Sequence, residues 1–152
     1  MGSKAMRQFA LVLGLALIVI SAGHVSAQER KAINLSPTRG LPFSDGVIAG
    51  NTLYVAGQEG TDESNKLVAG GIAAETKAAL DNIEKVLKAG GFELKDIVSV
   101  TVYLADIHDF PEMNKVYKAV IPDPKPARAT IQAAALVNDA RIEIAAIAVK
   151  QK

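Results

Sequence analysis

A C-terminal segment that is apolar on both of its alternating faces constrains the fold most strongly. Over residues 141–150, Ile142 and Ile144 recur at the two-residue spacing of a β-strand, yet residues 145–149 are apolar throughout. Residues 131–136 show the same pattern. Such a strand either lies centrally in a sheet within one chain or packs one face against another subunit. Because a domain of this size rarely covers a strand completely, the sequence favours oligomerisation.

The remaining patterns alternate between strand and helix within one domain. The expected elements are an edge strand over 32–35, a hairpin over 47–56, a helix over 72–89, a strand over 98–104, a helix over 110–120, and strands over 128–136 and 141–150. Asp109 is expected to cap the second helix, and Glu75 to lie outside the apolar face of the first. This order predicts an α+β fold with a single mixed sheet and two helices on one face.

The first 27 residues have the features of a secretory signal peptide. Lys4 and Arg7 precede an apolar run over 9–20, which Val25-Ser26-Ala27 follows. Twelve apolar residues span only about 18 Å as a helix, against about 30 Å of bilayer hydrocarbon, which disfavours a membrane anchor. We therefore expect a secreted or periplasmic protein, cleaved near Ala27, with one folded domain over 28–152.

Composition excludes several kinds of functional site. The chain has no cysteine, and outside residues 1–27 its one histidine is His108, so a zinc site built from His and Cys is impossible. No G-x-S-x-G, G-x-G-x-x-G or G-x-x-x-x-G-K-[ST] motif occurs. Residues 1–27 hold two of the 17 basic side chains and none of the 16 acidic ones, so the remainder has a net charge of −1. Any chemistry is therefore expected from arginine, carboxylates, amides and backbone groups.

Five segments, in their order and spacing, resemble the RidA family, also known as the YjgF family, over residues 42–150. The segments are Asn51-Thr52-Leu53-Tyr54-Val55-Ala56-Gly57-Gln58, Val100-Thr101-Val102-Tyr103-Leu104-Ala105-Asp106, Asp109-Phe110 through Met113-Asn114-Lys115-Val116-Tyr117, Pro126-Ala127-Arg128-Ala129-Thr130 and Ile142-Glu143-Ile144-Ala145-Ala146-Ile147-Ala148. The resemblance implies a chorismate-mutase-like fold, assembled as a homotrimer around a central barrel with ligand clefts between neighbouring subunits. It also implies hydrolysis of 2-imino acids, such as 2-iminobutanoate and 2-iminopropanoate, to 2-oxo acids and ammonia, with no metal and no organic cofactor.

The resemblance also assigns site residues. Arg128 corresponds to the arginine that binds the substrate carboxylate, for which a guanidinium presents a matching fork of donors. Glu143 corresponds to the acidic residue that passes protons to and from the attacking water. The family places the Thr130 carbonyl near that water, and Asn114 and the Gly57 backbone in the cleft. By pattern alone, Arg128 would be a solvated arginine and Glu143 an ordinary polar strand residue.

Three substitutions make the expected cleft more apolar than is usual in the family. Phe43 stands where a tyrosine hydroxyl is expected, and Ala56 and Ala129 stand where serine is common. A lost hydrogen bond to a charged ligand typically costs about 1.5–3 kcal/mol. Two functions therefore remain open: an imine deaminase, favoured by Arg128 together with Glu143, and a non-catalytic trimer that binds small carboxylates. A third, an RNA-acting endoribonuclease-like protein, is disfavoured by the net charge and the expected signal peptide.

Overall fold

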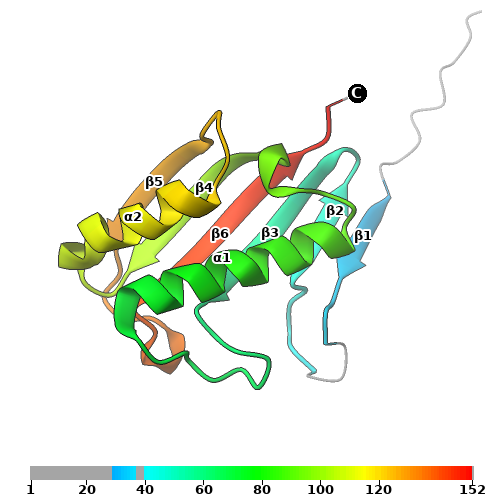
Figure 1. Ribbon diagram of the computed structural model, residues 1–152. Helices are drawn as coiled ribbons and strands as arrows, with labels where there is room; N and C mark the ends of the chain where they lie inside the picture. The colour runs from blue at the N-terminus through cyan, green and yellow to red at the C-terminus, as the bar shows by residue number, and fades with distance from the viewer. Residues whose placement is uncertain (1–28, 37–39, 152) are drawn as a thin grey trace, which may run out of the picture.

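The computed structural model describes residues 29–36 and 40–151 (Figure 1). The expected signal peptide lies outside these residues. The strands are β1 (Arg30–Ile33), β2 (Gly46–Ala49), β3 (Thr52–Glu59), β4 (Ile97–Leu104), β5 (Ala127–Gln132) and β6 (Ile142–Val149); the helices are α1 (Gly71–Ala89) and α2 (Phe110–Val120), with short 3-10 helices η2 (Leu94–Asp96), η3 (Ile107–Asp109) and η4 (Val137–Asp139). Within the described part of the chain, no helix has the length and apolar character needed to cross a membrane.

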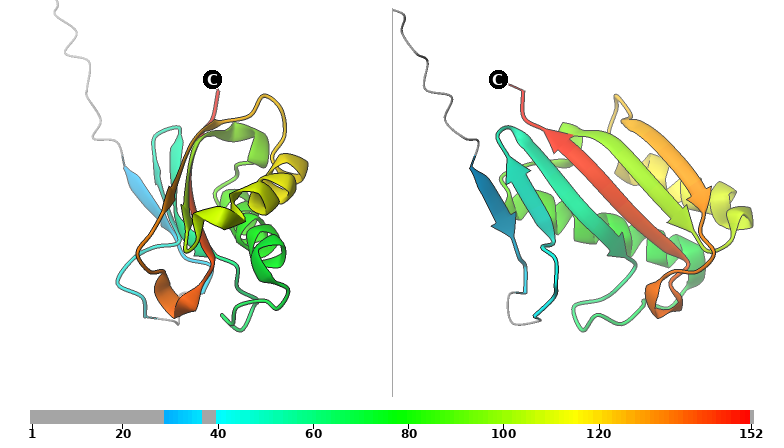
Figure 2. Two further views of the ribbon diagram at one scale, coloured as in Figure 1. Left: turned by 90° about the vertical axis from the view of Figure 1, so that its left-hand side faces the viewer. Right: turned by 180° about the vertical axis from the view of Figure 1, so that it is seen from behind.

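The strands form one mixed sheet in the order β1-β2-β3-β6-β4-β5. Neighbouring strands are antiparallel except β4 and β5, which are parallel and are connected through α2. Both helices cover the same face of the sheet, and the other face is open (Figure 2). The predicted α+β architecture, a single mixed sheet with two helices on one face, is confirmed.

The core lies between the helices and the middle of the sheet. Its fully buried side chains include Leu53 of β3, Leu80, Ile83 and Leu87 of α1, Val102 and Leu104 of β4, Met113 of α2, and Ile142 and Ile144 of β6. The α1 residues recur at spacings of three and four, as the predicted amphipathic helix requires. Gly91, with φ 78°, follows the end of α1 in the left-handed conformation that glycine favours.

Strand β6 lies centrally, between β3 and β4, but the chain covers only one of its faces. Ile142, Ile144, Ala146 and Ala148 are buried under the helices, whereas the alternating residues between them are half-buried. On the neighbouring strands, Tyr54 is 50% exposed and Ile131 is 49% exposed. Their cross-strand partners, Ile147 and Tyr103, place both side chains on the open face. Contact of this face with another subunit remains a prediction.

Two predicted strand boundaries are wrong. The strand predicted over 128–136 ends at Gln132, because the chain then turns into η4, where Asn138 and Asp139 have φ of 57° and 58°. The edge strand ends at Ile33 rather than continuing to residue 35. The N–H of Leu35 donates instead to the buried carboxylate of Asp45 at 2.7 Å, which draws this segment out of the sheet ladder.

Two predictions about acidic side chains are also wrong. Asp109 does not cap α2; its carboxylate accepts hydrogen bonds from the Arg141 guanidinium at 2.8–3.1 Å. The capping side chain is instead that of Asp106, which precedes η3 and accepts a hydrogen bond from the N–H of His108 at 2.9 Å. Glu75 is only 5% exposed and does not face solvent. Its Oε2 accepts a hydrogen bond from the N–H of Arg141, just before β6, at 2.8 Å.

Candidate functional site

Arg128 lies on the edge strand β5 and faces the helix side of the sheet, opposite Val100 of β4. Its Nη2 donates to Oδ1 of Asn114 at 2.7 Å, and its Nη1 lies 3.9 Å from the sulfur of Met113. Within the described residues, these contacts engage two of the five N–H donors of the guanidinium. Helix α2 therefore holds the guanidinium while leaving donors for a carboxylate.

Two aromatic rings from α2 also pack against the Arg128 guanidinium. The guanidinium carbon lies 4.4 Å from the centre of the Tyr117 ring and 5.6 Å from that of Phe110, both within cation–π range. Burial raises the pKa of the Tyr117 hydroxyl, and the positive charge of Arg128 opposes that rise. The hydroxyls of Tyr117 and Thr130 are buried without a hydrogen-bond partner in the described structure. Such groups are rare, and a polar ligand would satisfy them.

Glu143 points to the open face of the sheet, away from Arg128. It is the half-buried residue between Ile142 and Ile144 of β6, both of which face the helices. Its carboxylate lies across the backbone of Gly57 so closely that a Cβ atom at position 57 would come within 1.8 Å of the Glu143 Oε1. Only glycine at position 57 leaves the carboxylate in this place. Burial, and after it the negative charge of Glu59, raises the pKa of Glu143.

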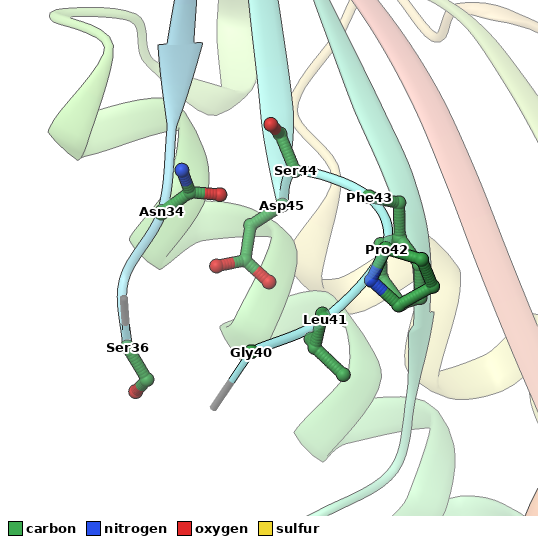
Figure 3. Close-up of a pocket in the computed structure, with 8 residues that line it drawn as sticks. All are labelled: Asn34, Ser36, Gly40, Leu41, Pro42, Phe43, Ser44 and Asp45. Carbon is green, nitrogen blue, oxygen red and sulfur yellow. The ribbon is translucent and has the colours of Figure 1, made fainter. Parts of the chain in front are cut away.

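The Glu143 carboxylate lines a cavity of about 770 Å³ at one end of the sheet. Gly57, Gln58, Glu59 and Phe43 also line it. A smaller cavity of about 270 Å³ adjoins it and shares Phe43 and Asp45 in its lining. Figure 3 shows the Asp45 carboxylate between the two chain segments that bound the smaller cavity. Phe43, expected in the ligand cleft, is 57% exposed at this place.

The site residues named from the sequence thus form two separate groups. Arg128, Asn114 and Thr130 lie on α2 and β5, on the helix side of the sheet. Gly57, Glu143 and Phe43 lie around the cavity, and Ala56 lies next to Gly57 on β3. Because the sheet separates Arg128 from Glu143, one chain does not bring the arginine and the acid together.

Sequence reasoning missed three contributors to these groups. Tyr117 and Phe110 lie within the helix predicted over 110–120, but their contact with Arg128 depends on where α2 packs against β5. Glu59 directly follows Gly57-Gln58, so its proximity to the assigned glycine was the available signal. His108, by contrast, is exposed, and its ring lies 2.7 Å from the Asp106 carboxylate, away from both groups.

Comparisons with known proteins agree on one family. The family described as Endoribonuclease L-PSP matches residues 34–150. A human protein named 2-iminobutanoate/2-iminopropanoate deaminase is 42% identical over 129 residues, covering 83% of this chain and 94% of that protein. The rat protein of the same name is 46% identical over 129 residues, which cover 83% of this chain and 94% of that protein. The crystal structure of the YjgF gene product from E. coli is similar with a TM-score of 0.74 and 33% identity, covering 80% of this chain and 99% of that one.

Proposed function

Because the chain belongs to the Endoribonuclease L-PSP family, which includes the RidA and YjgF proteins, we propose that it is an imine deaminase. It would hydrolyse small 2-imino acids to 2-oxo acids and ammonia, the activity for which its human and rat relatives are named. The observation that carries the proposal is the Arg128 guanidinium, which Asn114 and Tyr117 hold with donors still available. This arrangement suits a small ligand with one carboxylate.

The reaction follows from the two groups of residues. Arg128 binds the substrate carboxylate, which places the imine carbon for attack. Water adds to that carbon and forms a carbinolamine, as the C=N bond becomes a single bond and nitrogen gains a proton. The C–N bond then breaks, ammonia leaves and the C=O bond forms. Glu143 exchanges the protons of water and nitrogen in these steps, because its carboxyl group is half-buried and can hold or release a proton.

The separation of Arg128 and Glu143 indicates how the enzyme is assembled. We propose a homotrimer in which three sheets enclose a barrel, and each cleft takes Arg128 from one subunit and Glu143 from its neighbour. The open face supports this arrangement, since Tyr54, Ile131 and Ile147 give it an apolar surface that the helices do not cover. Arg128 lies on the edge strand β5, where a neighbouring subunit can approach it.

One observation favours a second function, a non-catalytic trimer that binds small carboxylates. Phe43 lines the cavity without a hydroxyl, and Ala56 adds none beside Gly57. Such a protein would keep the carboxylate site at Arg128 and lack turnover. No comparable feature supports action on RNA: Glu59, Asp62, Glu63 and Glu143 line the cavity with Lys85, and this acidic lining would repel a phosphate backbone.

We also propose that the protein is exported. The support is in the sequence, where two basic residues, a short apolar run and Val25-Ser26-Ala27 precede the family domain. An exported deaminase would act on imino acids outside the cytoplasm.

A coupled assay tests the proposed activity. An amino-acid oxidase generates the imine from 2-aminobutanoate, and semicarbazide traps what remains of it. The chain from residue 28 onward should lower the amount of trapped imine and raise the rate at which 2-oxobutanoate appears. Unchanged trapping at micromolar protein, together with measurable binding of 2-oxobutanoate, would identify a binder instead.

A further inference from the structure

A second carboxylate lies beside Glu143 on the neighbouring strand, on the same face of the sheet. Glu59 of β3 is the cross-strand partner of Glu143 in β6, so both side chains lie on the same face. Both also line the cavity of about 770 Å³. Like charges placed directly opposite one another destabilise a sheet. An acidic pair at this position therefore calls for a functional explanation.

The structure fixes Glu59 in place from three sides. Its Oε2 accepts a hydrogen bond from Nδ2 of Asn138 in η4 at 3.1 Å. Its backbone carbonyl accepts from Nδ2 of Asn82 in α1 at 3.2 Å and from the N–H of Thr61 at 2.9 Å. On the other strand, the glycine at position 57 leaves the Glu143 carboxylate beside β3. The two carboxylates are thus held near one another by separate elements.

The other polar groups around Glu143 do not neutralise it. On the other side of β6, the cross-strand partner of Glu143 is Tyr103 of β4. The cavity also contains Asp45, Asp62 and Glu63 from the loops, and Lys85 from α1. Burial raises the pKa of Glu143 most, and the one neighbouring charge that adds to this rise is Glu59.

We propose that Glu59 is a positioning residue of the deaminase: its carboxylate, paired with Glu143 on the neighbouring strand, opposes ionisation of the Glu143 carboxyl group, which serves as the proton donor to the substrate nitrogen. This inference rests on the proposed function. In the step concerned, the Glu143 carboxyl transfers its proton to the imine nitrogen, and the resulting iminium carbon takes up the oxygen of water. The carboxylate then receives a proton from that water, which restores the acid for the departure of ammonia. A carboxyl group that retains its proton closer to neutral pH is better suited to this role.

The pH dependence of kcat/KM tests the inference. The limb of the pH profile that reports the titration of Glu143 is identified as the one that is missing from the residual activity of Glu143→Gln. In Glu59→Gln, which keeps an acceptor for Asn138 but removes the charge, the midpoint of that limb should move to lower pH. Glu59→Asp, which keeps the charge, should leave the midpoint near that of the wild type. Glu84→Gln is the matched control, because it removes one charge from an α1 ion pair with Lys88 and should not move the limb.

A second measurement does not depend on turnover. The ¹³C resonance of the Glu143 carboxyl, assigned by its absence in Glu143→Gln, should titrate at lower pH in Glu59→Gln than in the wild type. An unchanged limb and an unchanged titration, in a wild-type protein that hydrolyses imines, would overturn the role of Glu59 alone. A wild-type protein without imine turnover would overturn the proposed function and this inference with it.

Discussion

Replacing Arg128 with lysine keeps the positive charge and removes the geometry on which carboxylate binding depends. The guanidinium can donate two parallel N–H bonds to a carboxylate while another N–H remains bonded to Asn114 at 2.7 Å. A lysine ammonium is a point charge without the planar fork of donors, so it does not reproduce the two parallel bonds to a carboxylate. At least one charge-assisted hydrogen bond is lost, which is worth about 1.5–3 kcal/mol and corresponds to an increase in Kd of about 10- to 150-fold.

Calorimetric titration with 2-oxobutanoate measures this change directly. Arg141→Lys is the matched control, because Arg141 bonds to Asp109 at an exposed position outside the site and its replacement should leave the affinity unchanged. Wild-type affinity in Arg128→Lys would mean that a different group binds the carboxylate. A loss of the same size in Arg141→Lys would mean that the effect comes from the fold and not from the site.

Three further perturbations test other parts of the account. Glu143→Gln should still bind 2-oxobutanoate but lower kcat in the imine assay by about 10²–10⁴-fold, and retained turnover would remove Glu143 from the chemistry. Gly57→Ala should displace the Glu143 side chain, whose Oε1 would lie 1.8 Å from the new Cβ, and lower kcat by about 10²-fold with little change in Tm; full activity would refute the close contact. A reporter fused to residues 1–30 should cross the inner membrane and be cut near Ala27, as N-terminal sequencing would show, whereas an uncut cytoplasmic reporter would contradict export.

The parts of the fold set by local patterns could be predicted from the sequence. The helix predicted over 72–89 agrees with α1, because its apolar spacing and the glycines after it act within a few residues of one another. The local pattern predicts that Asp109 caps α2, yet Asp109 binds Arg141, which lies 32 residues further along the chain. Glu75 is buried for a related reason, since it accepts a hydrogen bond from the start of β6. Long-range partners of this kind have no local signal.

The site shows the same division between local and long-range information. Arg128 and Glu143 could be named from their motifs, and alternation placed Glu143 opposite the buried side chains of its own strand. The sequence did not show that the two residues face opposite sides of the sheet, because this depends on the registers of β4 with β5 and of β4 with β6. The pairing of Glu59 with Glu143 depends in turn on the register between β3 and β6 and on the bulge between Val55 and Gln58.

Mixed trimers test the central claim, that imine hydrolysis occurs in clefts shared between subunits, most directly. Arg128→Ala and Glu143→Gln, each expressed alone, are expected to retain at most about 1% of the wild-type turnover. Co-expressed with different affinity tags and purified as mixed assemblies, they should form some clefts that combine an intact Arg128 from one subunit with an intact Glu143 from its neighbour. Every cyclic trimer that contains both chains has one complete cleft out of three, so activity should return to about a third of the wild-type value. Activity no higher than that of the separate variants, in assemblies shown to contain both chains, would contradict the shared cleft.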